Sequence, residues 1–273
     1  MVRLTREVRF AVDPHRDQPI DGGNGHAGRP TLTGIGHFLV FRLTLEGEID
    51  PQSGYLRNIK DIDGAVRDTV VPFLETAVDE WSFVNSQKLA RTLVETIQFN
   101  DSLPRANIVA GELLLSPHLT LGWSASEPNM IRLSQKFEFS ASHRLHNPAL
   151  SSEENVALFG KCNNPMGHGH NYELQVTVSG VPDPKSEQII AVDALEQIVD
   201  EQVIKAFDHK HLNLEVAEFK TLNPSVENIA RVIYERLAPA LARSFKGRTD
   251  AKLASVTVWE TPKTWAEYSE NAK

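Results

Sequence analysis

Three histidines and the single cysteine of this 273-residue chain lie close together in the sequence. One residue separates His168 from His170, and five residues separate Cys162 from His168. The residues after this pair alternate as in a β-strand, so we expect both imidazoles on one face. A second predicted strand, residues 137–143, ends in His143. Three neutral imidazoles form a zinc site with an open fourth position, the pattern of catalytic zinc.

Each feature alone has an ordinary explanation. A His-x-His pair is most often a surface feature, and a single cysteine is most often a small buried hydrophobe. However, four of the ten histidines fall between His143 and His170. This grouping favours a metal site over isolated surface histidines.

The residues around these histidines also resemble a known family, that of 6-pyruvoyl-tetrahydropterin synthase. The similar runs are residues 140–145 (SASHRL), 159–165 (FGKCNNP) and 167–172 (GHGHNY). The wider resemblance covers about residues 131 to 273. It implies an α+β tunnelling fold (T-fold), in which each lobe is a four-stranded antiparallel sheet with two helices.

The resemblance also implies a catalytic relay beside the metal. Residues 207–212 (FDHKHL) are similar to a motif of the family and contain Asp208 and His209. His209 would accept a proton from Cys162 and lower the pKa of this thiol. Asp208 would fix the tautomer of the His209 ring. Without the resemblance, cationic side chains at a helix C-terminus would be the better interpretation.

Pterin binding is implied for residues near the C-terminus. Ser225 and Glu227 lie in a segment similar to a pterin-binding motif of the family, and Glu260 resembles a second anchor. A carboxylate can accept two adjacent N–H groups from the edge of a pterin. Arg144 and Lys161 flank the site in the sequence and are weak candidates for phosphate contacts.

The resemblance implies a reaction as well. The substrate would be 7,8-dihydroneopterin triphosphate, the product 6-pyruvoyl-tetrahydropterin, zinc the Lewis acid, and Mg²⁺ a candidate companion of the triphosphate. The alternative is 6-carboxytetrahydropterin synthase of the queuosine pathway, which typically has three residues between Cys and His. The five residues between Cys162 and His168 favour the pyruvoyl product. A third interpretation is a non-catalytic pterin-binding protein.

Composition excludes several classes of protein. The formal net charge is −8, and no long basic block is present, which argues against nucleic acid as a partner. One cysteine allows no intrachain disulfide, and no run approaches the roughly 18 apolar residues of a membrane span. We therefore expect a cytoplasmic protein without a membrane partner.

Hydrophobic periodicity predicts the order β-β-α-α-β-β twice. The elements expected in the first half are strands at 5–12, 36–45, 108–115 and 119–124 and helices at 58–80 and 86–98. Those expected in the second half are strands at 137–143, 170–179, 253–260 and 265–269 and helices at 193–207 and 224–241.

Sequence identity supports a repeat. Residues 34–53 and 167–186, aligned without gaps at an offset of 133, match at 8 of 20 positions. Chance would give about one match on average residue usage. We therefore predict two tandem lobes, a degenerate lobe at 1–130 and a catalytic lobe at 131–273.

The first lobe lacks the chemistry of the second. In the alignments Ile35 stands at the place of His168, Arg29 at that of Cys162 and Pro14 at that of His143. His37 remains at the place of His170, and one histidine does not hold zinc. The other replacements are Glu75-Thr76 for Asp208-His209, Gln87 for Glu227, and either Glu112 or Trp123 for Glu260.

The two lobes also predict an assembly. A single lobe would have exposed sheet edges, and such edges must be paired or covered. The resemblance implies closed barrels of several lobes with sites between subunits. We expect a homotrimer of tandem chains, or a larger assembly of two three-chain barrels.

Overall fold

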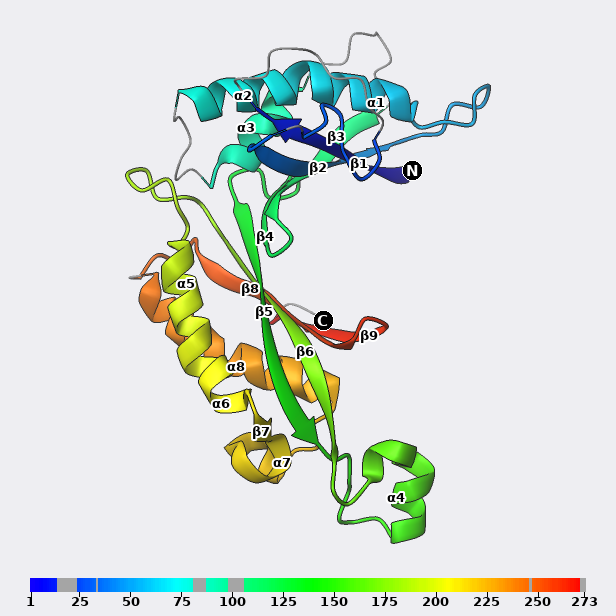
Figure 1. Cartoon of the computed structure of the whole chain (residues 1–273), viewed down its shortest axis with the longest axis vertical. Helices are drawn as coiled ribbons and strands as arrows, with labels where there is room; N and C mark the ends of the chain where they lie inside the picture. The colour runs from blue at the N-terminus through cyan, green and yellow to red at the C-terminus, as the bar shows by residue number, and fades with distance from the viewer. Residues whose placement is uncertain (14–23, 33, 81–86, 98–105, 246, 271–273) are drawn as a thin grey trace. The chain divides into compact units, whose positions relative to one another are not determined.

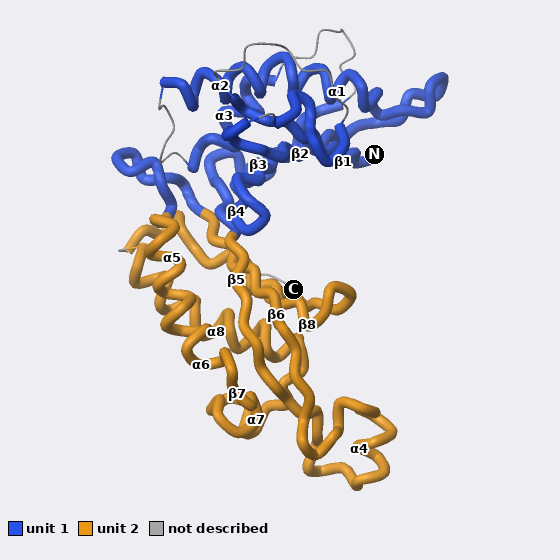
Figure 2. The backbone as a smooth tube through the Cα atoms, in the orientation of Figure 1, with its two compact units in different colours: residues 1–134, 180–189 blue, residues 135–179, 190–273 orange. Residues whose placement is uncertain are grey.

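The chain folds into two compact units in a computed structural model that describes residues 1–13, 24–32, 34–80, 87–97, 106–245 and 247–270 (Figure 1). Unit 1 contains residues 1–134 and 180–189, and unit 2 contains residues 135–179 and 190–273 (Figure 2). Within the described residues, no helix has the length and apolar character needed to cross a membrane.

Unit 1 contains four antiparallel strands in the order β1-β2-β3-β4. Its helices lie on one side of these strands (Figure 1). In chain order the elements are β1 (Val2–Val12), β2 (His37–Gly47), α1 (Ile59–Ala65), a π-helical turn (Val66–Val70), α2 (Val71–Asp79), α3 (Leu89–Thr96), β3 (Ala106–Ser116) and β4 (Leu119–Ser124).

Unit 2 repeats this order, with its main strands arranged β5-β6-β8-β9 and a short strand, β7, parallel to β5. The sheet elements are β5 (Ile131–His143, whose first residues belong to unit 1), β6 (His168–Gly180), β7 (Lys210–His211), β8 (Lys252–Thr261) and β9 (Thr264–Tyr268). The helices are α4 (Ser152–Phe159), α5 (Val192–Val199), α6 (Lys205–Phe207), α7 (Leu212–Glu215) and α8 (Val226–Ser244).

Each unit has its own core, formed where one face of the sheet meets the helices. Strand residues alternate between buried and accessible positions, so every second side chain packs on the helices. Fully buried side chains of unit 1 include Phe10, Phe41, Leu43, Val66, Val70 and Leu93. Those of unit 2 include Leu174, Val176, Leu195, Phe207, Ile233 and Val258.

The turn after the second strand has the same hydrogen bonds in both repeats. Asp50 Oδ1 accepts hydrogen bonds from the N–H groups two and three residues later and from the Ser53 hydroxyl, at 2.9, 2.9 and 3.2 Å. Asp183 Oδ1 does the same with the Ser186 hydroxyl, at 2.9, 3.0 and 3.3 Å. Ladder irregularities also coincide, since β2 and β6 shift register at positions separated by the predicted offset. The predicted α+β fold of tandem T-fold lobes is confirmed.

The repeats differ where the first long helix ends. Both helices contain a π-helical turn, at Val66–Val70 and Asp200–Ile204. In unit 1 the helix continues through α2, so Glu75 and Thr76 are helical. In unit 2 it ends at Phe207, and the chain then runs along β5 as β7.

The sequence prediction missed α4, although its start was readable. The Ser151 hydroxyl accepts the backbone N–H of Glu154, and the Glu154 carboxylate accepts the backbone N–H of Ser151. These two hydrogen bonds form a capping box. This helix leads into the turn that carries Cys162.

Candidate metal centre

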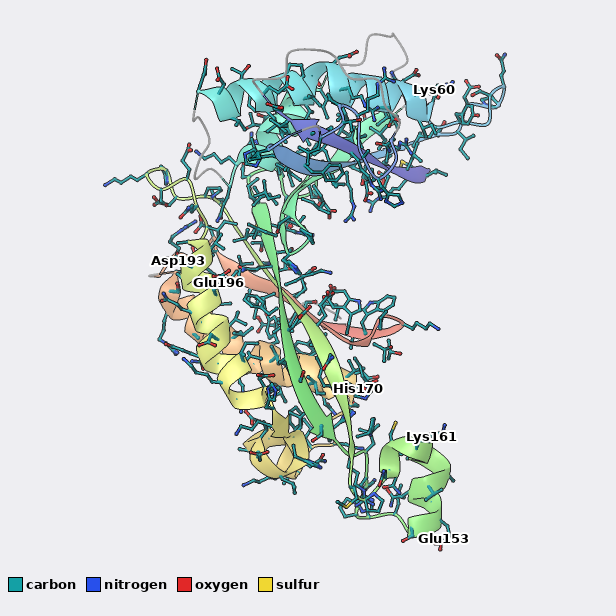
Figure 3. All side chains as sticks on the ribbon, viewed as in Figure 1. Lys60, Glu153, Lys161, His170, Asp193 and Glu196 are labelled. Carbon is teal, nitrogen blue, oxygen red and sulfur yellow. The ribbon has the colours of Figure 1, made fainter. Side chains whose placement is uncertain are left out.

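The three predicted metal ligands meet at the ends of β5 and β6. His143 is the last residue of β5, and His168 and His170 lie on the same face at the start of β6. Their ring centroids are 4.6 to 5.2 Å apart, and one nitrogen from each ring lies within 4.8 Å of the others. Figure 3 labels His170 on β6. The three side chains could hold one metal ion.

The tautomer of His143 is set by a backbone carbonyl. His143 is fully buried, and its Nδ1 lies 2.7 Å from the oxygen of Pro224. A carbonyl oxygen only accepts, so Nδ1 carries the proton and Nε2 presents a lone pair. Nε2 is buried and has no hydrogen-bond partner among the described atoms. A nitrogen prepared in this way suits a metal ion.

The surroundings of the other two rings favour the form that binds metal. Burial lowers the pKa of His168, and the neighbouring rings of His143 and His170 lower it further. Burial is also the main cause of the lowered pKa of His170. Lowered pKa values favour the neutral imidazole, whose lone pair is the metal ligand.

Glu260 reaches the histidines from β8. Its Oε1 atom lies 3.3 Å from His143 Nε2 and 3.5 Å from His170 Nε2. An ionised carboxylate facing the lone pair of His143 is stable only with a cation or proton between them. The donor set therefore fits a zinc ion.

A β-bulge in β8 positions the carboxylate of Glu260. The pairing of β8 with β9 passes from Trp259 to Thr261 and leaves Glu260 unpaired. The pairing of β3 with β4 passes from Leu114 to Ser116 in the same way. The two bulges align at an offset of 145 residues, because 259 − 114 and 261 − 116 are both 145.

The bulges correct one prediction. Leu115 of unit 1 stands at the place of Glu260, so the expectation of Glu112 or Trp123 is wrong. Glu112 corresponds instead to Thr257. Sequence alignment could not find this because neither strand pair has a sequence match strong enough to fix the register. Unit 1 has an apolar side chain where unit 2 has the carboxylate.

Cys162 lies in a short 3₁₀ turn, Gly160–Asn163, after α4. The thiol-bearing residue is half-buried, and its carbonyl oxygen accepts the N–H of Leu145 at 2.9 Å. Next to it, the buried Asn163 accepts hydrogen bonds from Arg144 and His146 through its side-chain oxygen, at 3.0 and 3.1 Å. These bonds hold the turn against the end of β5.

The two weak phosphate candidates lie in different surroundings. Arg144 donates to both the carbonyl and the side-chain oxygen of Asn163, which makes it part of the support of the turn. Lys161 is exposed on the α4 side of unit 2 (Figure 3). Of the two, Lys161 has the side chain free to meet a ligand.

Asp208 and His209 form a pair at the edge of β5. Asp208 accepts the N–H of Ser140 at 2.8 Å and lies 2.7 Å from His209 Nδ1. The N–H of Ser140, and then His209, lower the pKa of Asp208. His209 has φ of 56°, a left-handed conformation, and its side chain is 82% exposed. Asp208 therefore orients His209 Nε2 away from itself.

His209 lies at a pocket that also reaches one of the metal ligands. This pocket of about 440 Å³ is lined by His209, by His170 and by Ser140, Ser142 and Asn171, which by strand alternation lie on the face opposite His143. Ser140 donates to Asn171 at 2.8 Å, which fixes the two residues on that face. Among the described residues, the thiol of Cys162 has no hydrogen bond to His209.

The predicted pterin-binding residues begin α8. Ser225 caps the helix and accepts the N–H of Asn228 at 3.5 Å. Glu227 is exposed in the first turn, and its carboxylate has no ion pair or hydrogen bond within the described part of the chain. Pro224, immediately before this cap, is the residue bonded to His143, so the α8 terminus and the metal centre are joined.

Sequence reasoning missed Tyr172. It follows His168 and His170 on the same face of β6, and alternation could have found it. Its ring is fully buried, stacks on Phe139 at 4.9 Å and lies edge-on to both His143 and His170. Burial, followed by nearby Glu260, raises the pKa of its hydroxyl, which has no partner among described atoms.

The equivalent region of unit 1 lacks such a cluster. His37 and Ile35 are exposed, and Pro14 lies outside the described residues. The backbone of Arg29 is bonded to Arg9 and Arg67. In the described part of the chain, the His143–His168–His170 group is the cluster close enough to hold a metal.

The model of the family described as 6-pyruvoyl tetrahydropterin synthase matches residues 132–271. The chain belongs to this family. The human 6-pyruvoyl tetrahydrobiopterin synthase is 43% identical over 110 residues, which are 40% of this chain and 76% of the human protein. The Drosophila melanogaster protein of that name is 36% identical over 136 residues, 50% of this chain and 77% of that protein.

Other family members differ in name or distance. A 6-carboxy-5,6,7,8-tetrahydropterin synthase of Haemophilus influenzae is 28% identical over 161 residues, covering 52% of this chain and all of that protein. The solved structure of the Caenorhabditis elegans 6-pyruvoyl tetrahydropterin synthase superposes with a TM-score of 0.46 at 36% identity, covering 51% of this chain and 95% of that one.

Proposed function

We propose that this protein is a zinc-dependent lyase that converts 7,8-dihydroneopterin triphosphate to 6-pyruvoyl-tetrahydropterin with release of triphosphate. The observation that carries the proposal is the cluster of His143, His168 and His170, in which one nitrogen of each ring lies within 4.8 Å of the others and has no hydrogen-bond partner among the described atoms. Family membership over residues 132–271 supports it. A bound zinc ion would act as a Lewis acid on the oxygens of the substrate side chain.

The protein's own residues would bind substrate and move protons. The Cys162 thiolate takes a proton from a side-chain carbon and returns it to another atom of the substrate. His209, oriented by Asp208, accepts the thiol proton. Ser225, Glu227 and Glu260 hold the pterin, with the carboxylates accepting its adjacent N–H groups. No external redox cofactor is needed in this proposal, and Mg²⁺ accompanies the triphosphate.

The relay requires a second chain in this proposal. The side chain of His209 is 82% exposed and has no hydrogen bond to Cys162 among the described residues, which supports a site in which Asp208 and His209 serve a neighbouring Cys162. We propose a homotrimer of tandem chains, or two such barrels together, in which unit 1 supplies walls without chemistry. From the composition alone, we also propose that the protein is cytoplasmic and has no nucleic-acid or membrane partner.

One test separates the candidate reactions. The zinc-loaded protein is incubated with 7,8-dihydroneopterin triphosphate and Mg²⁺, and the products are analysed by mass spectrometry. A pyruvoyl product supports the proposal. A 6-carboxy product would support the alternative that the Haemophilus influenzae relative suggests, an early step towards queuosine. Unchanged substrate that stays bound would identify a non-catalytic pterin-binding protein.

A further inference from the structure

A segment of the second repeat is packed within unit 1. Residues 180–189 follow β6 but belong to unit 1 by their contacts. Gln87, at the start of α3, accepts the N–H of Ile189 at 2.8 Å and donates its own N–H to the carbonyl of Glu187 at 3.0 Å. Lys88 and Glu187 add an ion pair at 3.1 Å. The contact is a turn docked on the N-terminus of a helix.

Each side of this contact has a counterpart in the other repeat, and among the described residues neither counterpart makes an equivalent contact. Glu227 at the start of α8 corresponds to Gln87, and its exposed carboxylate has no hydrogen bond or ion pair among the described residues. Its N–H is one of the first helical donors, which have no intrahelical partner. A carboxylate accepts an N–H as well as an amide oxygen does, and with charge assistance. The α8 terminus therefore offers the same donor and acceptor as Gln87.

The counterpart of the docked turn is residues 47–56 of unit 1, at the offset of 133. It has the hydrogen bonds already described around Asp50, and Gly54 has φ of 73°, as Glu187 has 55°. Its apolar side chains are uncovered, since Ile49 is 49% and Tyr55 is 58% exposed. In the docked turn, Pro182 at the place of Ile49 is buried, Gln188 at the place of Tyr55 is half-buried, and Ile189 at the place of the half-buried Leu56 is 4% exposed. An exposed apolar turn of this kind indicates an interaction surface.

We propose that residues 47–56 of one chain dock on the α8 N-terminus of a second copy of this chain. The N–H of Leu56, which corresponds to Ile189, is donated to the Glu227 carboxylate of the copy. The N–H of Glu227 is donated to the carbonyl of Gly54. Tyr55 and Ile49 lose their exposure to water in this contact.

The contact joins different surfaces of two identical chains. Each chain has one such turn in unit 1 and one such helix N-terminus, that of α8. Copies therefore associate head to tail and can close into a ring. Because Pro224 links this terminus to His143, the neighbour's turn lies beside the metal centre. An ionised carboxylate has about four lone-pair sites, so Glu227 can accept the N–H of Leu56 and still accept the N–H groups of a pterin. The inference rests on the assembly part of the proposed function and names its contact.

Disulfide trapping tests the contact directly. Gly54→Cys and Glu227→Cys are made in separate chains that also carry Cys162→Ala, so each has one cysteine. The positions match Glu187 and Gln87, whose backbones are hydrogen-bonded at 3.0 Å. Mild oxidation of the mixture should give a species of two linked chains on a non-reducing gel. The matched control replaces Gly54→Cys with Ile35→Cys, a fully exposed position of unit 1.

Linkage no greater than in the control overturns the inference. A second variant gives an independent measurement, since Tyr55→Asp should raise the dissociation constant of the assembly at least tenfold and Ile35→Asp should not. Light scattering on the unmodified protein separates the two proposals. An oligomer that does not cross-link refutes this contact alone, whereas a monomer refutes the assembly as well. Neither measurement depends on enzymatic turnover.

Discussion

The Nδ1 atom of His143 lies 2.7 Å from the carbonyl oxygen of Pro224, and this bond connects the metal centre to the start of α8. It leaves His143 Nε2 unprotonated beside Glu260 Oε1 at 3.3 Å. One hydrogen bond thus prepares the ligand and places the α8 terminus, with Ser225 and Glu227, next to the metal. The site is consequently sensitive to changes in either β5 or α8.

The first prediction concerns zinc content. His170→Ala removes one of three ligands and should reduce bound zinc from about one equivalent per chain to near zero after dialysis. His37→Ala is the matched control, because His37 stands at the same place of the first repeat and is exposed. Metal analysis of both purified variants measures the difference. Equal zinc in the two variants would refute the assignment.

The second prediction concerns Glu260. Glu260→Gln removes the charge that a pterin edge would meet, so pterin affinity should fall about tenfold to hundredfold, on the scale of one charge-assisted hydrogen bond. Zinc should be retained by the three histidines. Titration with a pterin and metal analysis give the two readouts, with Glu138→Gln, an exposed change on β5, as control. Loss of zinc with unchanged pterin affinity would instead make Glu260 a metal ligand.

Side-chain alternation explains why the metal centre was predictable. A His-x-His strand and a third strand-end histidine suffice to bring His143, His168 and His170 together. The contact of Glu260 with these rings was not predictable, because it depends on a bulge that only the strand register reveals. Likewise, the position of His209 was not predictable, because it depends on the end of the unit 2 helix at Phe207. The equivalent helix of unit 1 continues as α2. Periodicity predicts that helices exist, but their last turns depend on tertiary contacts.

The third prediction concerns the buried hydroxyl of Tyr172. It has no partner among the described atoms, so Tyr172→Phe should leave the free energy of unfolding unchanged or slightly raised. Tyr172→Ala removes a fully buried ring and should cost about 3–5 kcal/mol. Denaturant unfolding of both variants, with zinc held constant, makes the comparison. A large loss for the Phe variant would show that the hydroxyl has a partner in the folded protein.

The fourth prediction concerns pH and an ion pair between Glu218 and Arg236 of α8. Arg236 donates to both oxygens of Glu218, at 2.8 and 2.7 Å, and lowers the pKa of this carboxyl from its usual value of 4.5. The folded-state pKa of Glu218 lies below its unfolded-state pKa. The ion pair therefore contributes its full stability at pH values above the unfolded-state pKa. This stability disappears as the pH falls through the folded-state pKa.

Glu218→Gln should therefore destabilise the protein by about 1 kcal/mol at pH 7, as expected for a partly exposed pair. The difference from the unmodified protein should shrink towards pH 3. Urea unfolding across this pH range measures it, with the exposed Glu201→Gln as control. A difference that grows as the pH falls would contradict the assigned pKa direction.

The last prediction concerns the relay. Cys162→Ala and His209→Ala should each lower kcat by about 10²–10⁴-fold, while zinc content and far-UV circular dichroism stay unchanged. The exposed His209 has no hydrogen bond to Cys162 among the described residues, so its partner cysteine belongs to another chain in the proposed assembly. Co-expression of the two variants should then restore activity. Random mixing gives an intact cysteine and an intact histidine at about a quarter of the sites, and so about a quarter of the activity. If the relay acts within one chain, every site in the mixture has a defect and no activity returns.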